Sequence, residues 1–255
     1  MMIMPRELRR TMSDLHLELN NVSKRFGGLQ AVDHVSFTVT EPELIGMIGP
    51  NGAGKTTLTN LMSGMLKPSS GTIYLNGRRI DGHPPYDVTR AGLGRTFQIT
   101  RALGRMTVME NMMVPGLAHN PRGGRADLEA RAHEILTLLT IDHLTNELSR
   151  ALSGGQRKLL ELGRLLMLDP AVIILDEPFA GVHPRLQDTI TNYINRVHEN
   201  GKAIMFISHN MGAVFELSQR LIVLHHGAVI ADGAPGAVRN DPAVIDAYLG
   251  HDEDD

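Results

Sequence analysis

The chain has no cysteine among its 255 residues. It can therefore form neither disulfides nor metal sites with thiolate ligands, and this absence fits a reducing cytosol without requiring one. Its stability has to come from a hydrophobic core. A chain of this length can bury a substantial core, and it suits one large domain, or one domain with a subdomain, better than two independent domains.

Long apolar runs are also missing. The longest uninterrupted aliphatic stretches, such as Val172–Leu175, have the length of a strand and fall far short of the ~20 residues that cross a bilayer. We therefore expect no membrane span. The segment Met1–Met12 carries three arginines but lacks the apolar core of a signal peptide, so we expect residues 1–14 to form an N-terminal tail.

A strong excess of one charge is absent as well. The net charge is −3, and residues 251–255 contain four consecutive acids that we expect to form an acidic tail. The remainder of the chain is close to neutral and offers no strongly basic face. Nucleic acid is therefore not an expected partner.

What the chain does contain is a glycine-rich loop between an apolar strand and a helix. Leu44–Ile48 predicts a buried strand, and after it Leu58, Leu61, Met62 and Met65 recur on one face of a predicted helix that starts at Gly54. The loop between them follows the pattern Gly-x4-Gly-Lys-Thr of a phosphate-binding loop. Its residues are Gly49, Pro50, Asn51, Gly52, Ala53, Gly54, Lys55, Thr56 and Thr57.

This loop has the chemistry that polyphosphates require. Its glycines allow close approach of the backbone, so that N–H groups and the helix dipole face the phosphate oxygens. Lys55 would neutralise charge on the β- and γ-phosphates, and Thr56 would offer its hydroxyl to Mg²⁺. The alternative is a glycine-rich turn with an exposed lysine, which the flanking strand and helix disfavour. The loop alone indicates only a nucleotide-binding protein, because kinases, GTPases and helicases share it.

A second apolar strand delivers two acids to the same region. Val172–Leu175 runs into Asp176 and Glu177, and ligands of open α/β sheets bind at the carboxyl ends of strands. Because successive side chains of a strand point to opposite faces, the two carboxylates are expected to have different roles. The alternative is a pair of exposed acids that merely ends a strand.

Local patterns organise the rest of the chain. Asn76–Gly77 between two short strands predicts a tight hairpin, and Val35, Phe37 and Val39 alternate as in a half-buried strand. After Pro170, strands and helices alternate, which predicts a parallel sheet with crossover helices. The predicted elements of this last third are Val172–Leu175, Pro184–Glu199, Ala203–Ile207 and two short strands around His226–Gly227.

The middle of the chain, about residues 99–165, is expected to be mostly helical. Thr107 and Glu110 have the spacing of a capping box. Apolar residues then recur at helical period at Leu128, Ala132, Ile135, Leu136 and Leu139. Together these patterns predict an inserted helical subdomain.

The element Leu152–Gln156, with the sequence Leu-Ser-Gly-Gly-Gln, opens another apolar-periodic helix. Ser153 can cap this helix, and Gly154 and Gly155 expose its N-terminal N–H groups as a second anion site. An ordinary capped helix is the alternative. With the phosphate loop and the two acids, this element resembles the ATP-binding subunit of an ATP-binding cassette (ABC) transporter, and the resemblance covers about residues 15–250. It implies an α/β fold: a P-loop NTPase core with a mainly parallel sheet, an N-terminal antiparallel β part and the helical insertion.

The resemblance also implies roles for single residues. Asp176 resembles the aspartate associated with Mg²⁺, and Glu177 resembles the general base that orients or deprotonates the attacking water. Gln98 stands where the family has a glutamine that reaches Mg²⁺ and this water. His209 resembles the histidine that contacts the γ-phosphate. Phe26 resembles the aromatic residue that stacks on adenine, although a buried core phenylalanine is a serious alternative.

In the resembled family the second anion site acts on the other subunit. Ser153, Gly154, Gly155 and Gln156 would close over the γ-phosphate of the nucleotide that the partner holds. Hydrolysis would then require two cassettes, identical or paralogous, that face each other head to tail around two MgATP. Such a cassette drives separate transmembrane permease subunits from the cytoplasmic face of the cell membrane.

Several short motifs resemble the importers of branched-chain amino acids, which also use a substrate-binding protein. They are Phe26–Leu29, Gly94–Gln98, Met106–Val108, Glu110–Asn111, Phe179–Gly181 and the ending from Arg239 to Gly250. His183 and Ser208–Asn210 depart from the usual pattern in loops that serve inter-subunit contacts, so they bear on partner identity rather than on hydrolysis.

Other functions stay open at this point. Related cassettes serve urea import or the export of lipid or lipopolysaccharide. A soluble ABC ATPase of translation or DNA repair is a third possibility, but the second cassette, coiled coil or basic extension of those proteins is not found here. A nucleotide-dependent regulator without turnover is disfavoured by Glu177 and His209.

Residues from about Ile99 to Met113 are rich in methionine and predict the permease-docking surface. Alternatively, Met106, Met109, Met112 and Met113 fill the helical core.

Overall fold

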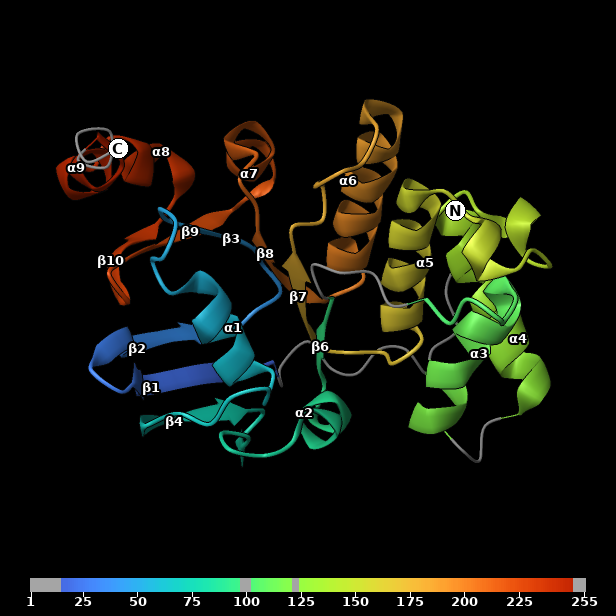
Figure 1. Ribbon diagram of the computed structural model, residues 1–255, viewed down its shortest axis with the longest axis horizontal. Helices are drawn as coiled ribbons and strands as arrows, with labels where there is room; N and C mark the ends of the chain where they lie inside the picture. The colour runs from blue at the N-terminus through green and yellow to red at the C-terminus, as the bar shows by residue number, and fades with distance from the viewer. Residues whose placement is uncertain (1–14, 97–101, 121–123, 250–255) are drawn as a thin grey trace.

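The computed structural model describes residues 15–96, 102–120 and 124–249 (Figure 1). Its strands are β1 (Leu17–Phe26), β2 (Leu29–Val39), β3 (Leu44–Ile48), β4 (Ser70–Leu75), β5 (Arg78–Arg79), β6 (Leu93–Arg95), β7 (Val172–Asp176), β8 (Ala203–Ile207), β9 (Arg220–His225) and β10 (Ala228–Gly233). Its α-helices are α1 (Lys55–Met62), α2 (Pro85–Ala91), α3 (Val108–His119), α4 (Arg125–Leu138), α5 (Gly154–Leu166), α6 (Pro184–Glu199), α7 (Met211–Leu217), α8 (Pro235–Arg239) and α9 (Pro242–Leu249).

The larger sheet has the strand order β10-β9-β3-β8-β7-β6. Its strands pair in parallel from β9 to β6, and only β10 runs antiparallel, against β9. The predicted, mainly parallel sheet is therefore confirmed. Its order places β3, which leads into the glycine-rich loop, two strands away from β7, which carries the acids. The carboxyl ends of β3, β8 and β7 thus meet at one edge of the sheet.

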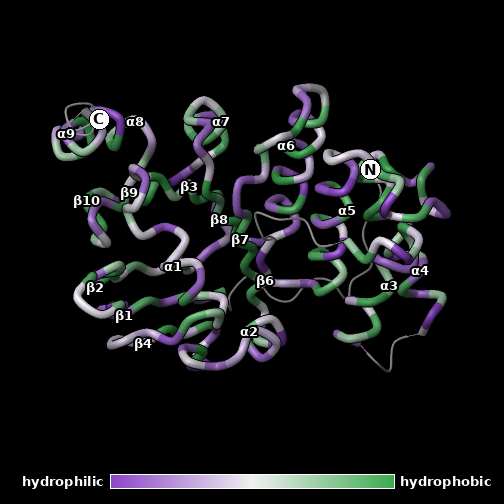
Figure 2. The backbone as a smooth tube through the Cα atoms, viewed as in Figure 1, coloured by the Kyte–Doolittle hydropathy of each residue, from purple (hydrophilic) through white to green (hydrophobic). Residues whose placement is uncertain are grey.

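The central strands β3, β7 and β8 are apolar because both faces of the sheet are covered. Every residue of these three strands is buried, and Figure 2 shows them largely in green. Successive side chains enter two different cores. One face, with Ile173 and Leu175, packs with residues of α3 to α6. The other face, with Ile174 and Met47, packs with α1 and the antiparallel strands.

The antiparallel part has the order β2-β1-β4-β5. The predicted alternation in β2 is confirmed, because Val35, Phe37 and Val39 are buried while their neighbours are more exposed. The predicted hairpin is confirmed too. Asn76 and Gly77 join β4 to β5 with φ angles of 51° and 75°, as a tight turn between antiparallel strands requires.

Helices α3, α4 and α5 pack against one another and lie on the right of the view in Figure 1, away from the antiparallel sheet. The capping box of α3 is confirmed, since the Glu110 backbone N–H donates to Thr107 Oγ1 (3.1 Å) and the Thr107 N–H donates to Glu110 Oε2 (2.7 Å). The predicted core positions from Leu128 to Leu139 are all buried. The boundaries of a separate helical subdomain, about residues 99–165, stay a prediction.

The predicted helix after Gly54 is shorter than expected, and the placement of Met65 on its apolar face is wrong. Helix α1 ends at Met62, and the following Gly64 adopts a φ of 74° that turns the chain, so Met65 leaves the apolar face and is 49% exposed. The predicted tails, residues 1–14 and 251–255, lie outside the described residues. Among the residues that the structure describes, no helix is long and apolar enough to cross a membrane.

Candidate functional site

The glycine-rich loop follows β3 and has a backbone that only glycine accommodates at its first position. Gly49 has a φ of 150°, and a Cβ placed on it would lie 2.1 Å from the carbonyl oxygen of Leu224. Gly52 also has a positive φ, of 77°, but a Cβ there would meet nothing within 4 Å. The loop is thus held tightly to β9 at its base and is open at its tip, where a ligand can approach the backbone.

The loop ends at the N-terminus of α1. Within the described residues no side chain caps this helix, and Gly54 occupies the N-cap position. Its first N–H groups therefore lack side-chain partners, and the positive end of the helix dipole adds to them. A helix start of this kind after a glycine-rich loop fits phosphate groups.

Lys55 lies at the centre of the loop and is only 8% exposed. Its Nζ donates to the carbonyl oxygens of Gly49 (2.5 Å) and Pro50 (2.9 Å). Burial lowers the pKa of this ammonium group below its usual value, and the negative charge of Glu177 opposes the shift. The loop thus presents a buried cation whose direct partners are neutral carbonyl groups.

Asp176 ends β7 beside β6. Its backbone N–H donates to Thr96 Oγ1 (3.0 Å), and its Oδ2 accepts a hydrogen bond from Arg95 Nη2 (2.9 Å). Both side chains of this ion pair are buried. The buried ammonium of Lys158, on α5, donates to the backbone oxygen of Asp176 (3.4 Å). The end of β7 is therefore held from two neighbouring elements.

Glu177 follows with a strained backbone. Its φ of 49° is unusual for a residue with a side chain, and such strain is common at functional sites. Its Oε1 lies 3.4 Å from Nε2 of His209, and its Oε2 accepts from the backbone N–H of His209 (3.4 Å). Both residues line a pocket of about 270 Å³ together with Phe179, Ala180, Ser208 and Asn210. The structure thus brings together two residues that are far apart in the sequence.

Ser153 caps α5 in a second capping box. Its Oγ accepts from the N–H of Gln156 (3.2 Å), and Gln156 Oε1 accepts from the N–H of Ser153 (2.9 Å). Ser153 and Gly154 are exposed, while Gly155 faces α6, where a Cβ would lie 2.4 Å from Cδ1 of Leu186. In Figure 1, α5 and α1 lie on opposite sides of β7 and β8. Helices α1 and α5 therefore belong to different parts of the molecule.

Phe26 ends β1 at the turn before β2. Its ring is not part of the core, because the residue is 46% exposed, and Lys24 Nζ lies 5.1 Å from the ring centroid. The alternative of a buried core phenylalanine is therefore wrong. An exposed ring at this position can stack on a planar ligand. Gln98, the remaining predicted site residue, lies outside the described residues.

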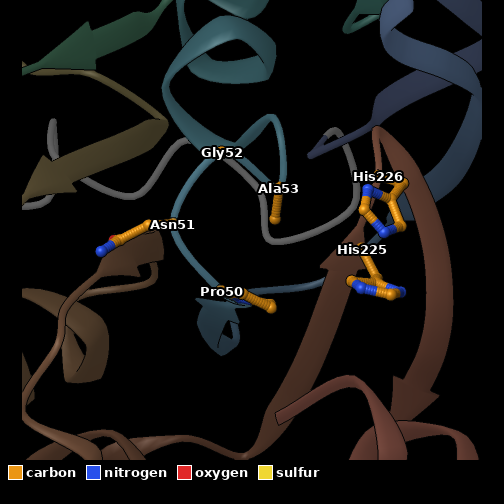
Figure 3. A pocket seen from close by; sticks show the side chains of 6 residues that line it. All are labelled: Pro50, Asn51, Gly52, Ala53, His225 and His226. Carbon is orange, nitrogen blue, oxygen red and sulfur yellow. The ribbon is translucent and has the colours of Figure 1, made fainter. Parts of the chain in front are cut away.

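Two features near the loop were not predicted. His225 and His226 line a pocket of about 160 Å³ with the loop residues from Pro50 to Ala53, and Figure 3 shows their rings beside Pro50 and Ala53. Their hairpin is tied to the loop, since the Gly227 N–H donates to the Ala53 carbonyl (3.0 Å). The second feature is Arg95. No local sequence pattern indicated its contact with Asp176, because the pairing of β6 with β7 arises only in the fold.

Comparisons with known proteins agree with this geometry. Residues 32–180 match the family model described as ABC transporter, and residues 228–254 match that of the branched-chain amino acid ATP-binding cassette transporter. The chain is 37% identical to the high-affinity branched-chain amino acid transport ATP-binding protein BraF of Pseudomonas aeruginosa, over 92% of this chain and 97% of the relative. It is 38% identical to the corresponding protein LivG of Escherichia coli, over 94% and 99%.

The fold has solved relatives as well. An ATP-binding cassette of an ABC transporter in its ADP conformation superposes with a TM-score of 0.81, at 34% identity, over 92% of this chain and 99% of that one. The phosphate loop, the acidic strand end and the capped glycine pair thus occur here in a fold shared with nucleotide-binding cassettes. The chain belongs to the family of ABC transporter ATP-binding subunits, which are ATPases, and it is similar over nearly its whole length to members named for branched-chain amino acid transport.

Proposed function

We propose that this ATPase drives the import of branched-chain or other amino acids by dimerising around two MgATP and acting on separate permease subunits. The observation that carries the ATPase site is the meeting of three groups at one edge of the sheet. These are the buried ammonium of Lys55, the carboxylate of Glu177, whose backbone is strained, and the imidazole of His209.

The loop from Gly49 to Thr57 would hold the phosphates. Backbone N–H groups at its open tip and at the start of α1 would donate to phosphate oxygens. Lys55 would exchange its two carbonyl partners for β- and γ-phosphate oxygens, because hydrogen bonds between two charged groups are stronger than those to a neutral carbonyl. The exposed ring of Phe26 would stack on adenine.

Three oxygen donors would hold the metal: the exposed hydroxyl of Thr56, the carboxylate of Asp176 and the carboxamide of Gln98. Hydroxyl, carboxylate and amide oxygens are ligands that suit Mg²⁺, so the residues fit this ion. When bound, Mg²⁺ neutralises developing charge on the β- and γ-phosphates.

Glu177 is the group best placed to act on the attacking water. Its carboxylate is held at the end of β7 by a strained backbone and faces a pocket of about 270 Å³. It would orient the water and accept its proton, and His209, which lines the same pocket, would donate to the γ-phosphate. The distance of 3.4 Å between their side chains permits this division of roles.

The separation of α1 from α5 supports a two-chain site. Ser153 and Gly154 are exposed at the start of α5. The glycine-rich loop of the same chain, which leads into α1, lies on the other side of β7 and β8. In a head-to-tail pair of cassettes, the start of α5 would cover the nucleotide of the partner. Gln156 would contribute mainly by holding the helix start, since its side chain caps its own helix.

The amino-acid substrate is supported by the names of the relatives and by the match of residues 228–254. An importer of this kind would place the chain on the inner face of the cell membrane, with permease subunits and a substrate-binding protein as partners. Urea import and the export of lipid or lipopolysaccharide are the competing transport functions.

The test is Glu177→Gln, with Glu129→Gln as the control, because Glu129 is a partly exposed acid on α4 that pairs with Arg125 away from the site. The amide cannot accept the proton of water, so we expect hydrolysis to fall by about 10²–10⁴-fold while ATP binding persists. Size-exclusion chromatography with ATP should then reveal a dimer. Near-normal hydrolysis by Glu177→Gln would remove this residue from the role of general base.

A further inference from the structure

Arg95 connects three elements of the site. From the end of β6, its Nη1 donates to Asn60 Oδ1 (2.6 Å) and to Ser63 Oγ (3.1 Å) on or just after α1, and its Nη2 donates to Asp176 Oδ2 (2.9 Å). One guanidinium group thus links the helix of the phosphate loop to the carboxylate at the end of β7.

The ion pair is shielded from solvent. The side chain of Arg95 is 5% exposed and that of Asp176 is 10% exposed. Charges buried to this degree are screened weakly by water and salt, so each strongly affects the other. Without Arg95, the carboxylate of Asp176 would be buried without its counter-ion, which is unfavourable.

We infer that Arg95 is a positioning residue that serves as the counter-ion of Asp176 in the metal-free cassette and thereby sets the Mg²⁺ concentration that nucleotide binding requires. The inference rests on the proposed function, in which Asp176 is a residue of the metal site. Because a guanidinium and a divalent cation repel each other, Arg95 opposes metal binding near Asp176 while it stabilises the empty site.

Arg95 and the residue after it, Thr96, both hold Asp176. Thr96, the next residue, pairs with β7 through the hydrogen bond from the Asp176 N–H to its Oγ1. Its own N–H donates to the Ile174 carbonyl (3.0 Å). Side chain and backbone of Asp176 are therefore both held by one dipeptide, which precedes Gln98 closely in the sequence.

The experiment titrates Mg²⁺ at a fixed concentration of a fluorescent, non-hydrolysable ATP analogue. For Arg95→Gln we expect the half-saturating Mg²⁺ concentration to fall by roughly tenfold, because a cation next to Asp176 has been removed. We also expect a lower unfolding temperature without metal, and a larger gain on adding Mg²⁺ with the analogue than in the wild type. A merely structural role of Arg95 would lower the unfolding temperature equally in both conditions.

Two variants serve as controls. Arg95→Lys keeps the charge and should keep a Mg²⁺ requirement near that of the wild type. Arg79→Gln breaks an Arg–Asp pair of the same length, 2.9 Å, but with an exposed arginine, and should change neither readout. If Arg95→Gln does not fold, Asn60→Ala, which loosens the guanidinium, replaces it and should lower the Mg²⁺ requirement by a smaller factor.

An unchanged or raised Mg²⁺ requirement in Arg95→Gln, or in Asn60→Ala where it stands in, overturns the inference. The proposed function fails separately, if the wild-type chain itself shows no Mg²⁺-dependent binding of the analogue.

Discussion

Lys55, Asp176 and Glu177 are charged residues that are each less than a tenth exposed, and the charge of each is compensated in a different way. The ammonium of Lys55 is bound by backbone carbonyls, Asp176 pairs with Arg95, and Glu177 lies beside the exposed His209. Burying charge is unfavourable unless it is compensated. At the residue scale, the site is distinguished by the gathering of these buried charged residues at one edge of the sheet.

Replacing Lys55 with alanine should act on nucleotide binding rather than only on turnover. The change removes a positive charge from a partly desolvated loop, so we expect the affinity for ATP to fall by at least about tenfold. Titration with fluorescent ATP measures the effect. Lys67→Ala, at an exposed position after α1, is the control and should bind normally. Unchanged affinity in Lys55→Ala would mean that the loop does not hold the phosphates as proposed.

At the element scale, α3 has two kinds of apolar surface. Met112 and Met113 are buried, so the core role expected for part of the methionine cluster is confirmed for these two. Met106, just before the helix, and Val114 and Leu117 on it are each more than a third exposed. Asn111 fixes the entry to α3, since its side chain bonds to backbone groups of the preceding segment. Met106 lies within the segment predicted to dock the permease, about Ile99 to Met113, whereas Val114 and Leu117 lie just beyond it.

A charge on this surface should uncouple the cassette from its permease. We expect Met106→Glu to lose permease association, or permease-stimulated hydrolysis, while ATP binding by the isolated chain survives, because the position is exposed and lies before the helix core. Met65→Glu is the matched control, since Met65 is also an exposed methionine but follows α1. Co-purification with the permease and stimulated ATPase rates are the measurements. Normal stimulation of Met106→Glu would place the docking surface elsewhere.

At the scale of the whole molecule, the two proposed half-sites of one chain lie apart from each other. The phosphate loop lies at α1 and the Ser153 element lies at the start of α5, on the other side of β7 and β8 (Figure 1). A second cassette in head-to-tail orientation would unite them. Residues of both chains would then be required for each hydrolysis site.

Ser153→Arg tests this arrangement. The bulky cation should leave ATP binding to the isolated monomer nearly unchanged but abolish hydrolysis, because the ligand of Ser153 belongs to the other chain. Mixing Ser153→Arg with Lys55→Ala chains restores one intact composite site in a mixed dimer, so some ATPase activity should return. Weak ATP binding by Ser153→Arg alone would contradict the assignment in trans. No recovery in the mixture would favour strict coupling between the two sites.

The sequence by itself determined the features that depend on neighbouring residues. The glycine-rich loop, the Asn76–Gly77 turn and the capping box of Thr107 and Glu110 are recognisable because their hydrogen bonds and backbone angles lie within a few residues. The order of strands and helices likewise predicted the parallel sheet. The family was indicated by a resemblance, which the loop, the two acids Asp176 and Glu177 and the element Leu152–Gln156 carry together.

Only the tertiary structure decided which distant groups meet. Nothing near Arg95 in the chain announces its pairing with Asp176, and the packing of β6 against β7 creates that contact. The exposure of Phe26 and of Met65 also depends on how the surrounding elements end and pack. Local patterns encode backbone geometry, whereas burial and long-range charge pairing arise only when segments far apart in sequence come together.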